Sequence, residues 1–148
     1  MGVKIKTMQP NKERMMPKLI VVHGISNSGK TSAIVQFMET HRNITASPFP
    51  SLITVPIQKS GNWLLGVAKD GDTAWHVQNA LRLFASHNCD IVVCATKSSG
   101  ASVTALNAFA AANPHITVVR IATTWSATST GQAAANAAVA LAIENNIP

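Results

Sequence analysis

The sequence predicts an α/β fold, a three-layer sandwich in which helices cover a mostly parallel sheet of roughly five strands. Short apolar, β-branched runs recur along the chain, and such uninterrupted runs are typical of strands buried on both faces. Segments with helical apolar spacing separate most of these runs at the lengths that parallel crossovers require. With 148 residues, 47% of them apolar, the chain is long enough to bury one well-filled core.

The chain is expected to begin with a flexible basic leader, residues 1–17, followed by one domain, residues 18–148. The leader is polar, contains Pro10 and Pro17, and shows no amphipathic period. It carries half of the net charge of +6, with four basic residues against one acidic residue. A basic arm can bind nucleic acid, but this one has no interleaved aromatic residues for base stacking. Nucleic acid therefore stays open as a partner.

The domain opens with a strand, a glycine loop and a helix. The strand is predicted at Lys18–His23, where Leu-Ile-Val-Val forms a buried apolar run. A helix is predicted from Thr31, because Ile34, Phe37 and Met38 are spaced to lie on one face. Between them the chain reads Gly24-Ile25-Ser26-Asn27-Ser28-Gly29-Lys30-Thr31, which fits the pattern G-x-x-x-x-G-K-[ST] in the strand-loop-helix context that the pattern requires.

Each residue type in that pattern has a chemical reason. Gly24 and Gly29 permit backbone conformations closed to other residues and let the chain approach an anion closely. Successive backbone N–H groups can then converge on a phosphate. Lys30 supplies a mobile positive charge for the β- and γ-phosphates, and the Thr31 hydroxyl suits a Mg²⁺ ligand position.

This stretch resembles the phosphate-binding loop of the P-loop NTPase superfamily, with a close match over about 20 residues, 18 to 37. The resemblance implies the P-loop NTPase fold, ATP or another nucleoside triphosphate, and Mg²⁺. It also implies a small member similar to nucleotide kinases, because the loop comes soon after the start of a short chain. The residues expected to contact the nucleotide are Gly24, Ser26, Asn27, Ser28, Gly29, Lys30, Thr31 and Ser32.

A second informative place follows the third predicted strand. Residues 51–56 form the second strand candidate, bracketed by Pro50 and Pro56, which favours a sheet edge. Residues 59–62 are expected to turn, and 63–68 form the third strand. The third strand is followed closely by Asp70 and Asp72, two of only six acidic residues in the chain. P-loop enzymes carry an acid at the tip of a strand beside the loop strand, so both are candidate Mg²⁺ ligands and catalytic residues. The alternative is that Asp72 caps the next helix and Asp70 belongs to a solvated turn.

The remaining predicted elements alternate regularly. Helices are expected at 73–87, from about 102 to 112, and at 131–145, and strands at 90–95 and 115–122. Because ligands in parallel sheets lie beyond the carboxyl ends of the strands, four loops should meet at one edge: 24–31, 70–72, 96–102 and 123–130. Lys97, in the third of these loops, is the candidate to stabilise a transferring phosphoryl group.

Three functions remain open. The first is a small phosphotransferase or ATPase with an unknown acceptor, although the arginine-bearing lid of such kinases has no counterpart between Thr96 and His115. The second is a nucleotide-binding switch. Thr96-Lys97-Ser98-Ser99 has Ser99 where a guanine-reading carboxylate belongs, so ATP is favoured over GTP. The third is a nucleic-acid-associated ATPase of the phage or mobile-element type.

Composition sets the remaining expectations. No apolar run reaches the ~18 residues that span a bilayer, and no signal-peptide pattern is present, so a cytoplasmic protein without a membrane partner is expected. The five histidines show no metal-ligand spacing. Cys89 and Cys94 are interpreted as small buried hydrophobes. Because only 12% of the residues are charged, part of the surface is expected to be covered by another subunit, which indicates a possible homo-oligomer.

Overall fold

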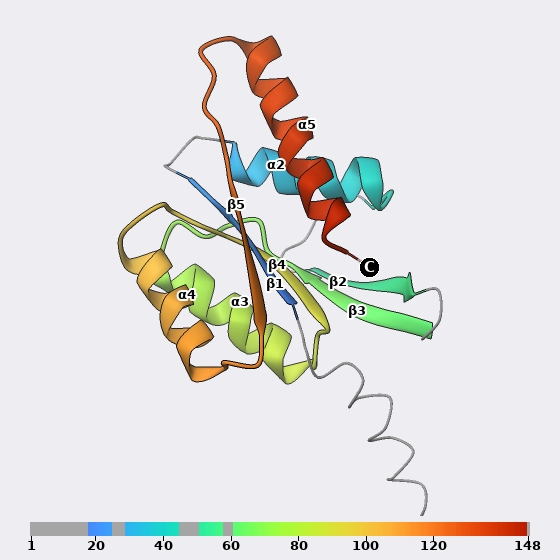
Figure 1. Cartoon of the computed structure of the whole chain (residues 1–148), viewed down its shortest axis with the longest axis vertical. Helices are drawn as coiled ribbons and strands as arrows, with labels where there is room; N and C mark the ends of the chain where they lie inside the picture. Colours follow the sequence, from blue (N-terminus) through green and yellow to red (C-terminus); the bar gives the residue numbers. More distant parts are fainter. Residues whose placement is uncertain (1–17, 25–28, 45–50, 58–60, 148) are drawn as a thin grey trace, which may run out of the picture.

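A single mixed sheet forms the centre of the structure, a computed structural model that describes residues 18–24, 29–44, 51–57 and 61–147 (Figure 1). Its strands are β1 (Lys18–His23), β2 (Ser51–Ile57), β3 (Gly61–Val67), β4 (Ile91–Thr96) and β5 (Thr117–Ala122). They lie in the order β2-β3-β4-β1-β5. Strands β3, β4, β1 and β5 run parallel, and β2 pairs antiparallel with β3 at one edge. The predicted α/β class with a mostly parallel sheet is confirmed.

Helices cover both faces of the sheet (Figure 1). On one face α2 (Lys30–Gln36), which continues as the π-helical turn η1 (Phe37–His41), packs against α5 (Ser129–Asn145). On the other face α3 (Ala74–Ser86) packs against α4 (Ala101–Ala112). An ion pair between Arg42 and Glu144, 2.9 Å apart, joins the end of η1 to α5. Among the described residues, no helix combines the length and the apolar character needed to cross a bilayer.

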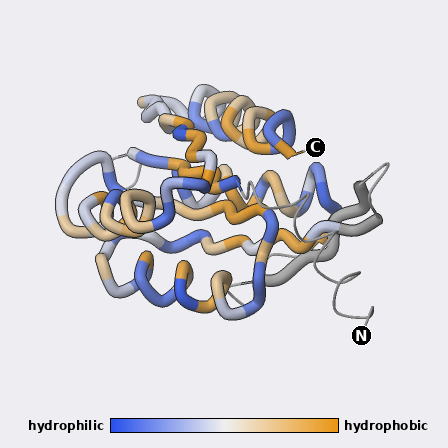
Figure 2. Tube along the Cα trace, turned by 60° about the horizontal axis from the view of Figure 1, so that its bottom comes forward, coloured by the Kyte–Doolittle hydropathy of each residue, from blue (hydrophilic) through white to orange (hydrophobic). Residues whose placement is uncertain are grey.

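Strand β1 shows why its sequence is apolar throughout. Side chains alternate between the two faces of a strand, so a strand covered on both sides needs apolar residues at every position. Leu19 and Val21 enter the core beneath α3 and α4, and Ile20 and Val22 enter the core beneath α2 and α5. Figure 2 shows the apolar residues concentrated along the central strands and the hydrophilic ones in the outer helix turns and loops.

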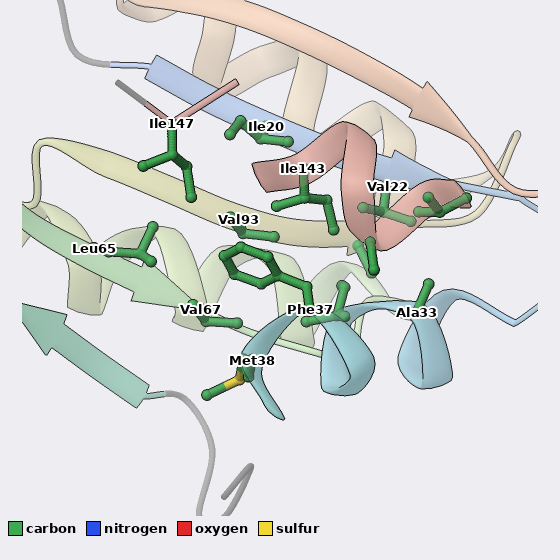
Figure 3. Close-up of a cluster of buried hydrophobic side chains, with 14 of the residues drawn as sticks. Ile20, Val22, Ala33, Phe37, Met38, Leu65, Val67, Val93, Ile143 and Ile147 are labelled. Atoms are coloured by element: carbon green, nitrogen blue, oxygen red, sulfur yellow. The ribbon is translucent and has the colours of Figure 1, made fainter. Parts of the chain in front are cut away.

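The larger core lies between the sheet, α2, η1 and α5. Figure 3 shows Phe37 directed from the helix toward the strands, near Val67 and Val93, with Ile143 of α5 approaching from the other side. Phe37 and Ile143 have no exposed surface. Burial of an apolar side chain of this size stabilises the fold by about 1.5–3 kcal/mol, so this contact fixes the junction of α2 and η1 against the sheet.

The connection between β2 and β3 is short, as the turn predicted after the second strand indicates. β2 and β3 form an antiparallel hairpin, with Ser51 opposite Val67 and Ile57 opposite Gly61. β2 does lie at the sheet edge, as the flanking prolines predicted. Of the turn predicted at 59–62, Gly61 and Asn62 belong to β3 instead, and residues 58–60 lie outside the described part of the chain.

Both cysteines are free thiols; the interpretation as buried hydrophobes is confirmed for Cys94, whereas Cys89 is only partly buried beside the small core around Phe84. Cys94 is buried in β4, and burial raises the pKa of its thiol to about 12. Burial, together with the nearby charge of Asp90, raises the pKa of Cys89 to about 11. Because the thiolate is the reactive form, neither residue is suited to act as a nucleophile at neutral pH.

Candidate functional site

The site begins where β1 ends. Its last residue, His23, leads to the buried Gly24, and the described chain resumes at Gly29, which has φ of 96° and precedes the first turn of α2. A positive φ is the backbone conformation that favours glycine. Residues 25–28, which include the predicted contacts Ser26, Asn27 and Ser28, lie outside the described part of the chain.

Lys30, the first residue of α2, is the most unusual side chain of this region because it is charged and only 6% exposed. Its Nζ donates a hydrogen bond to the carbonyl oxygen of Gly24, 2.9 Å away. The same Nζ lies 3.2 Å from the Oδ1 atom of Asp72. The lysine therefore connects the start of the glycine loop with the acidic turn that follows β3.

Thr31 and Ser32 follow on the exposed side of the helix. The Thr31 hydroxyl donates to the carbonyl oxygen of Lys69, 3.1 Å away, so it also faces the turn after β3. Two successive residues of α2 thus contact the same short segment, 69–72, which sequence spacing alone had marked as a candidate site.

The acidic turn reaches the loop by a route that the sequence did not predict. The acid-bearing strand was expected to lie beside β1, but β4 lies between β3 and β1. After β3, Ala68 donates its backbone N–H to Val93 of β4, and Gly71 lies so close to β4 that an added Cβ would overlap the carbonyl oxygen of Ala95. The turn therefore crosses the carboxyl end of β4 and brings Asp72 to Lys30.

Asp72 does not cap the following helix. Thr73 is the N-cap of α3, and its Oγ1 accepts a hydrogen bond from the backbone N–H of His76 at 3.1 Å. The helix-cap alternative for Asp72 is therefore wrong, and its carboxylate is free to face Lys30. The exposed Asp70 lines the same cavity.

The opposite side of the site comes from α5 and was not found from the sequence. Gln132 and Asn136 lie against Gly29, where an added Cβ would overlap Asn136 Oδ1 and come within 2.7 Å of Gln132 Nε2. Gln132 donates to Asn136 Oδ1 at 2.9 Å. Only the pairing of β5 with β1, which brings α5 over α2, places these amides at the loop, so no local signal could have identified them.

Together these residues enclose a cavity of about 380 Å³. Its floor is formed by residues 29–32. Its acidic side is formed by residues 69–72 and His76, and its amide side by Gln132 and Asn136. His76 was also missed as a site residue, since its position depends on how α3 starts.

Lys97 is placed at the same edge of the sheet but does not line this cavity. It follows β4, and its backbone N–H donates to the Oγ atom of Ser102, 2.9 Å away. That hydrogen bond turns the chain toward α4, on the opposite face of the sheet from α2 and α5. The structure therefore brings Lys30, Thr31, Asp70 and Asp72 together and leaves Lys97 apart from them.

The donor set fits a hard divalent cation in the presence of a phosphate. Thr31 and the two aspartates offer hydroxyl and carboxylate oxygens, which Mg²⁺ prefers, and Mg²⁺ is commonly held by one or two carboxylates together with substrate phosphates. Among the described residues, no group of three or more His, Cys, Asp or Glu side chains is placed to hold a metal without such a partner.

Comparison with protein-family models, with curated proteins and with solved structures finds no match to this chain.

Proposed function

We propose that the protein binds ATP with Mg²⁺ at the cavity between α2, the acidic turn and α5, and that it hydrolyses the nucleotide. The observation that carries this proposal is the charged Lys30, buried at the cavity floor between Gly24 and Asp72. A buried ammonium is costly unless anionic or carbonyl oxygens surround it, and here it lies at the mouth of a glycine loop with the phosphate-binding pattern.

The proposal gives a role to each side chain of the site. Lys30 can turn from Asp72 to the oxygens of a triphosphate, which carry more charge than one carboxylate. Thr31, Asp72 and Asp70, which line the same cavity, would hold Mg²⁺, and the metal would neutralise charge developing on the phosphates. The uncharged amides of Gln132 and Asn136 close the other side without repelling an anion.

Hydrolysis is favoured over transfer to a second substrate because of the position of Lys97. The sequence contains no arginine between Thr96 and His115, so a kinase-like reaction would need Lys97 at the transferring phosphoryl group. Lys97 does not line the cavity, and most of that interval is occupied by α4, which packs against α3. Water is therefore the acceptor that the geometry supports best.

The choice of ATP rests on the sequence. A guanine-reading loop needs a carboxylate to accept hydrogen bonds from the base, and Ser99 occupies the corresponding place after Thr96-Lys97.

Two lysines at the same sheet edge give a matched test. Lys30→Ala should weaken Mg²⁺–ATP binding by at least ~1.5–3 kcal/mol, the scale of a hydrogen bond to a charged group. Lys97→Ala should leave both affinity and phosphate release close to wild type. Isothermal titration and a phosphate-release assay measure these outcomes. Equal ATP affinity of Lys30→Ala and wild type would reject the proposed site. Loss of turnover in Lys97→Ala would favour phosphoryl transfer to a second substrate over hydrolysis. A tenfold preference for GTP would reject only the assignment of adenine as the base.

A further inference from the structure

The loop between β5 and α5 carries a tryptophan that the fold exposes although its backbone is held tightly. Trp125 is 62% exposed. The residue before it, Thr124, accepts a hydrogen bond through its carbonyl oxygen from Gln132 Nε2 at 3.1 Å. The residue after it, Ser126, donates its backbone N–H to Gln132 Oε1 at 2.9 Å. One side-chain amide thus clamps the backbone on both sides of Trp125.

Further contacts fix the same loop. Thr123 donates both its N–H and its hydroxyl to the carbonyl oxygen of His23, the last residue of β1, at 2.9 and 3.2 Å. Gly131 lies so close to Ser126 that an added Cβ would overlap the Ser126 hydroxyl. The loop therefore does not need the indole of Trp125 for its own packing. A large aromatic surface presented on a fixed backbone is suited to binding, because little conformational freedom is lost when a ligand stacks on it.

The position of Trp125 relative to the cavity indicates which part of a ligand would meet it. Gln132, which clamps the loop, also lines the amide side of the cavity. Asp70 and Asp72 mark the opposite, acidic side, where a metal and the terminal phosphates belong. A nucleotide lying along the floor with its γ-phosphate toward the acids would therefore extend its nucleoside toward the amide side and the β5–α5 loop.

We propose that Trp125 is the surface on which the base of the bound nucleotide stacks. This inference rests on the proposed nucleotide site and names its base-binding part. Stacking uses the face that every base possesses, so recognition at this position would depend weakly on base identity. The neutral amides beside it bear no carboxylate that would select guanine.

A second exposed tryptophan supplies the internal control. Trp75, in the first turn of α3, is 68% exposed, and its ring meets that of His76 edge-on, with centroids 5.5 Å apart. His76 lines the acidic side of the cavity, so Trp75 belongs to the end assigned to the metal and the terminal phosphates. The same substitution at the two tryptophans therefore tests opposite ends of the site.

The experiment compares Mg²⁺–ATP with Mg²⁺–tripolyphosphate, which has the phosphates but no base. Wild type should bind ATP more tightly than tripolyphosphate by about 5- to 150-fold, the range expected for stacking on one aromatic side chain. Trp125→Ala should remove most of this difference and leave the tripolyphosphate affinity unchanged. Trp125→Phe should retain much of it, and Trp75→Ala should retain all of it. ATP, but not tripolyphosphate, should quench a tryptophan emission that Trp125→Phe lacks.

The alternative outcomes are distinguishable. If Trp125→Ala leaves the preference for ATP intact, or lowers both affinities equally, the base does not stack there. If Trp75→Ala removes the preference instead, the nucleotide lies in the reverse direction and the inference is wrong. If wild type binds tripolyphosphate and ATP equally, the inference fails but the phosphate site stands. If wild type binds neither ligand, both this inference and the proposed function fail.

Discussion

At the scale of single residues, the ion pair between Lys30 and Asp72 links the glycine loop to the acidic turn. Lys30 is buried and Asp72 is half exposed, so the lysine depends on the contact more than the aspartate does. A triphosphate would supply other anionic oxygens to Lys30 and leave Asp72 able to bind Mg²⁺. Under the proposed function, the same carboxylate would stabilise the protein without ligand and bind the metal with it.

Asparagine substitutions separate the two acids. Asp72→Asn should abolish most Mg²⁺-dependent turnover and destabilise the nucleotide-free protein by about 1 kcal/mol, a modest value because water screens a half-exposed pair. Asp70→Asn should change stability by less than ~0.5 kcal/mol, since it lies exposed in the same turn. Chemical denaturation and phosphate release provide the measurements. Wild-type turnover in both variants would place the metal elsewhere, and a larger loss of turnover in Asp70→Asn would reverse the assignment.

At the scale of elements, the site depends on how one turn crosses the end of a neighbouring strand. Gly71 contacts the carbonyl group of Ala95, a backbone atom that cannot move aside like a flexible side chain. The crossing carries Asp72 from the tip of β3 over β4 to the loop that follows β1.

Gly71→Ala should therefore disturb both stability and ligand binding. We expect a loss of about 1–3 kcal/mol or more from overpacking. We also expect weaker Mg²⁺–ATP binding, because the turn must shift from the position that holds Asp72 beside Lys30. Gly100→Ala is the matched control: no atom lies within 4 Å of an added Cβ there, but φ of 101° makes it cost about 1 kcal/mol in strain. Thermal unfolding and titration of both variants decide the matter. An unchanged ATP affinity in Gly71→Ala would show that the turn does not position the site.

The sequence predicted the elements of this fold better than their arrangement. Apolar runs located the parallel strands, because strands buried on both faces must be apolar throughout. The same runs did not reveal that β4 lies between β3 and β1, since strand order is set by long-range packing. The motif and the paired acids identified the floor and the acidic side of the cavity. Gln132 and Asn136 could not be identified, because an amide on an alanine-rich helix has no local pattern that distinguishes it from a surface residue.

At the scale of the whole molecule, the site and the start of the domain lie at opposite ends of the sheet. β1 runs from Lys18 to His23, and its carboxyl end leads into the glycine loop. At the other end, the Lys18 backbone N–H bonds to Asp90 at 3.1 Å, and its Nζ donates to the carbonyl oxygen of Asn146 at 2.8 Å. Contacts from the residue before β4 and from the residue after α5 thus anchor the first residue of β1 within the domain itself.

This anchoring leads to a prediction for residues 1–17. Deleting them should leave the melting temperature within about 2 °C, because the polar leader has no apolar face to bury and Lys18 keeps its partners in the domain. The affinity for Mg²⁺–ATP should stay within about twofold, since the cavity lies at the far end of β1. Calorimetry and titration of the 18–148 chain, with an added initiator Met, measure both quantities.

A Lys18→Met variant of the full chain serves as the control, because it removes the contact to Asn146 while retaining the leader. A large drop in melting temperature on deletion alone would show that the leader packs against the domain. Loss of oligonucleotide binding on deletion, with ATP affinity preserved, would instead assign the basic leader a nucleic-acid role separate from the nucleotide site.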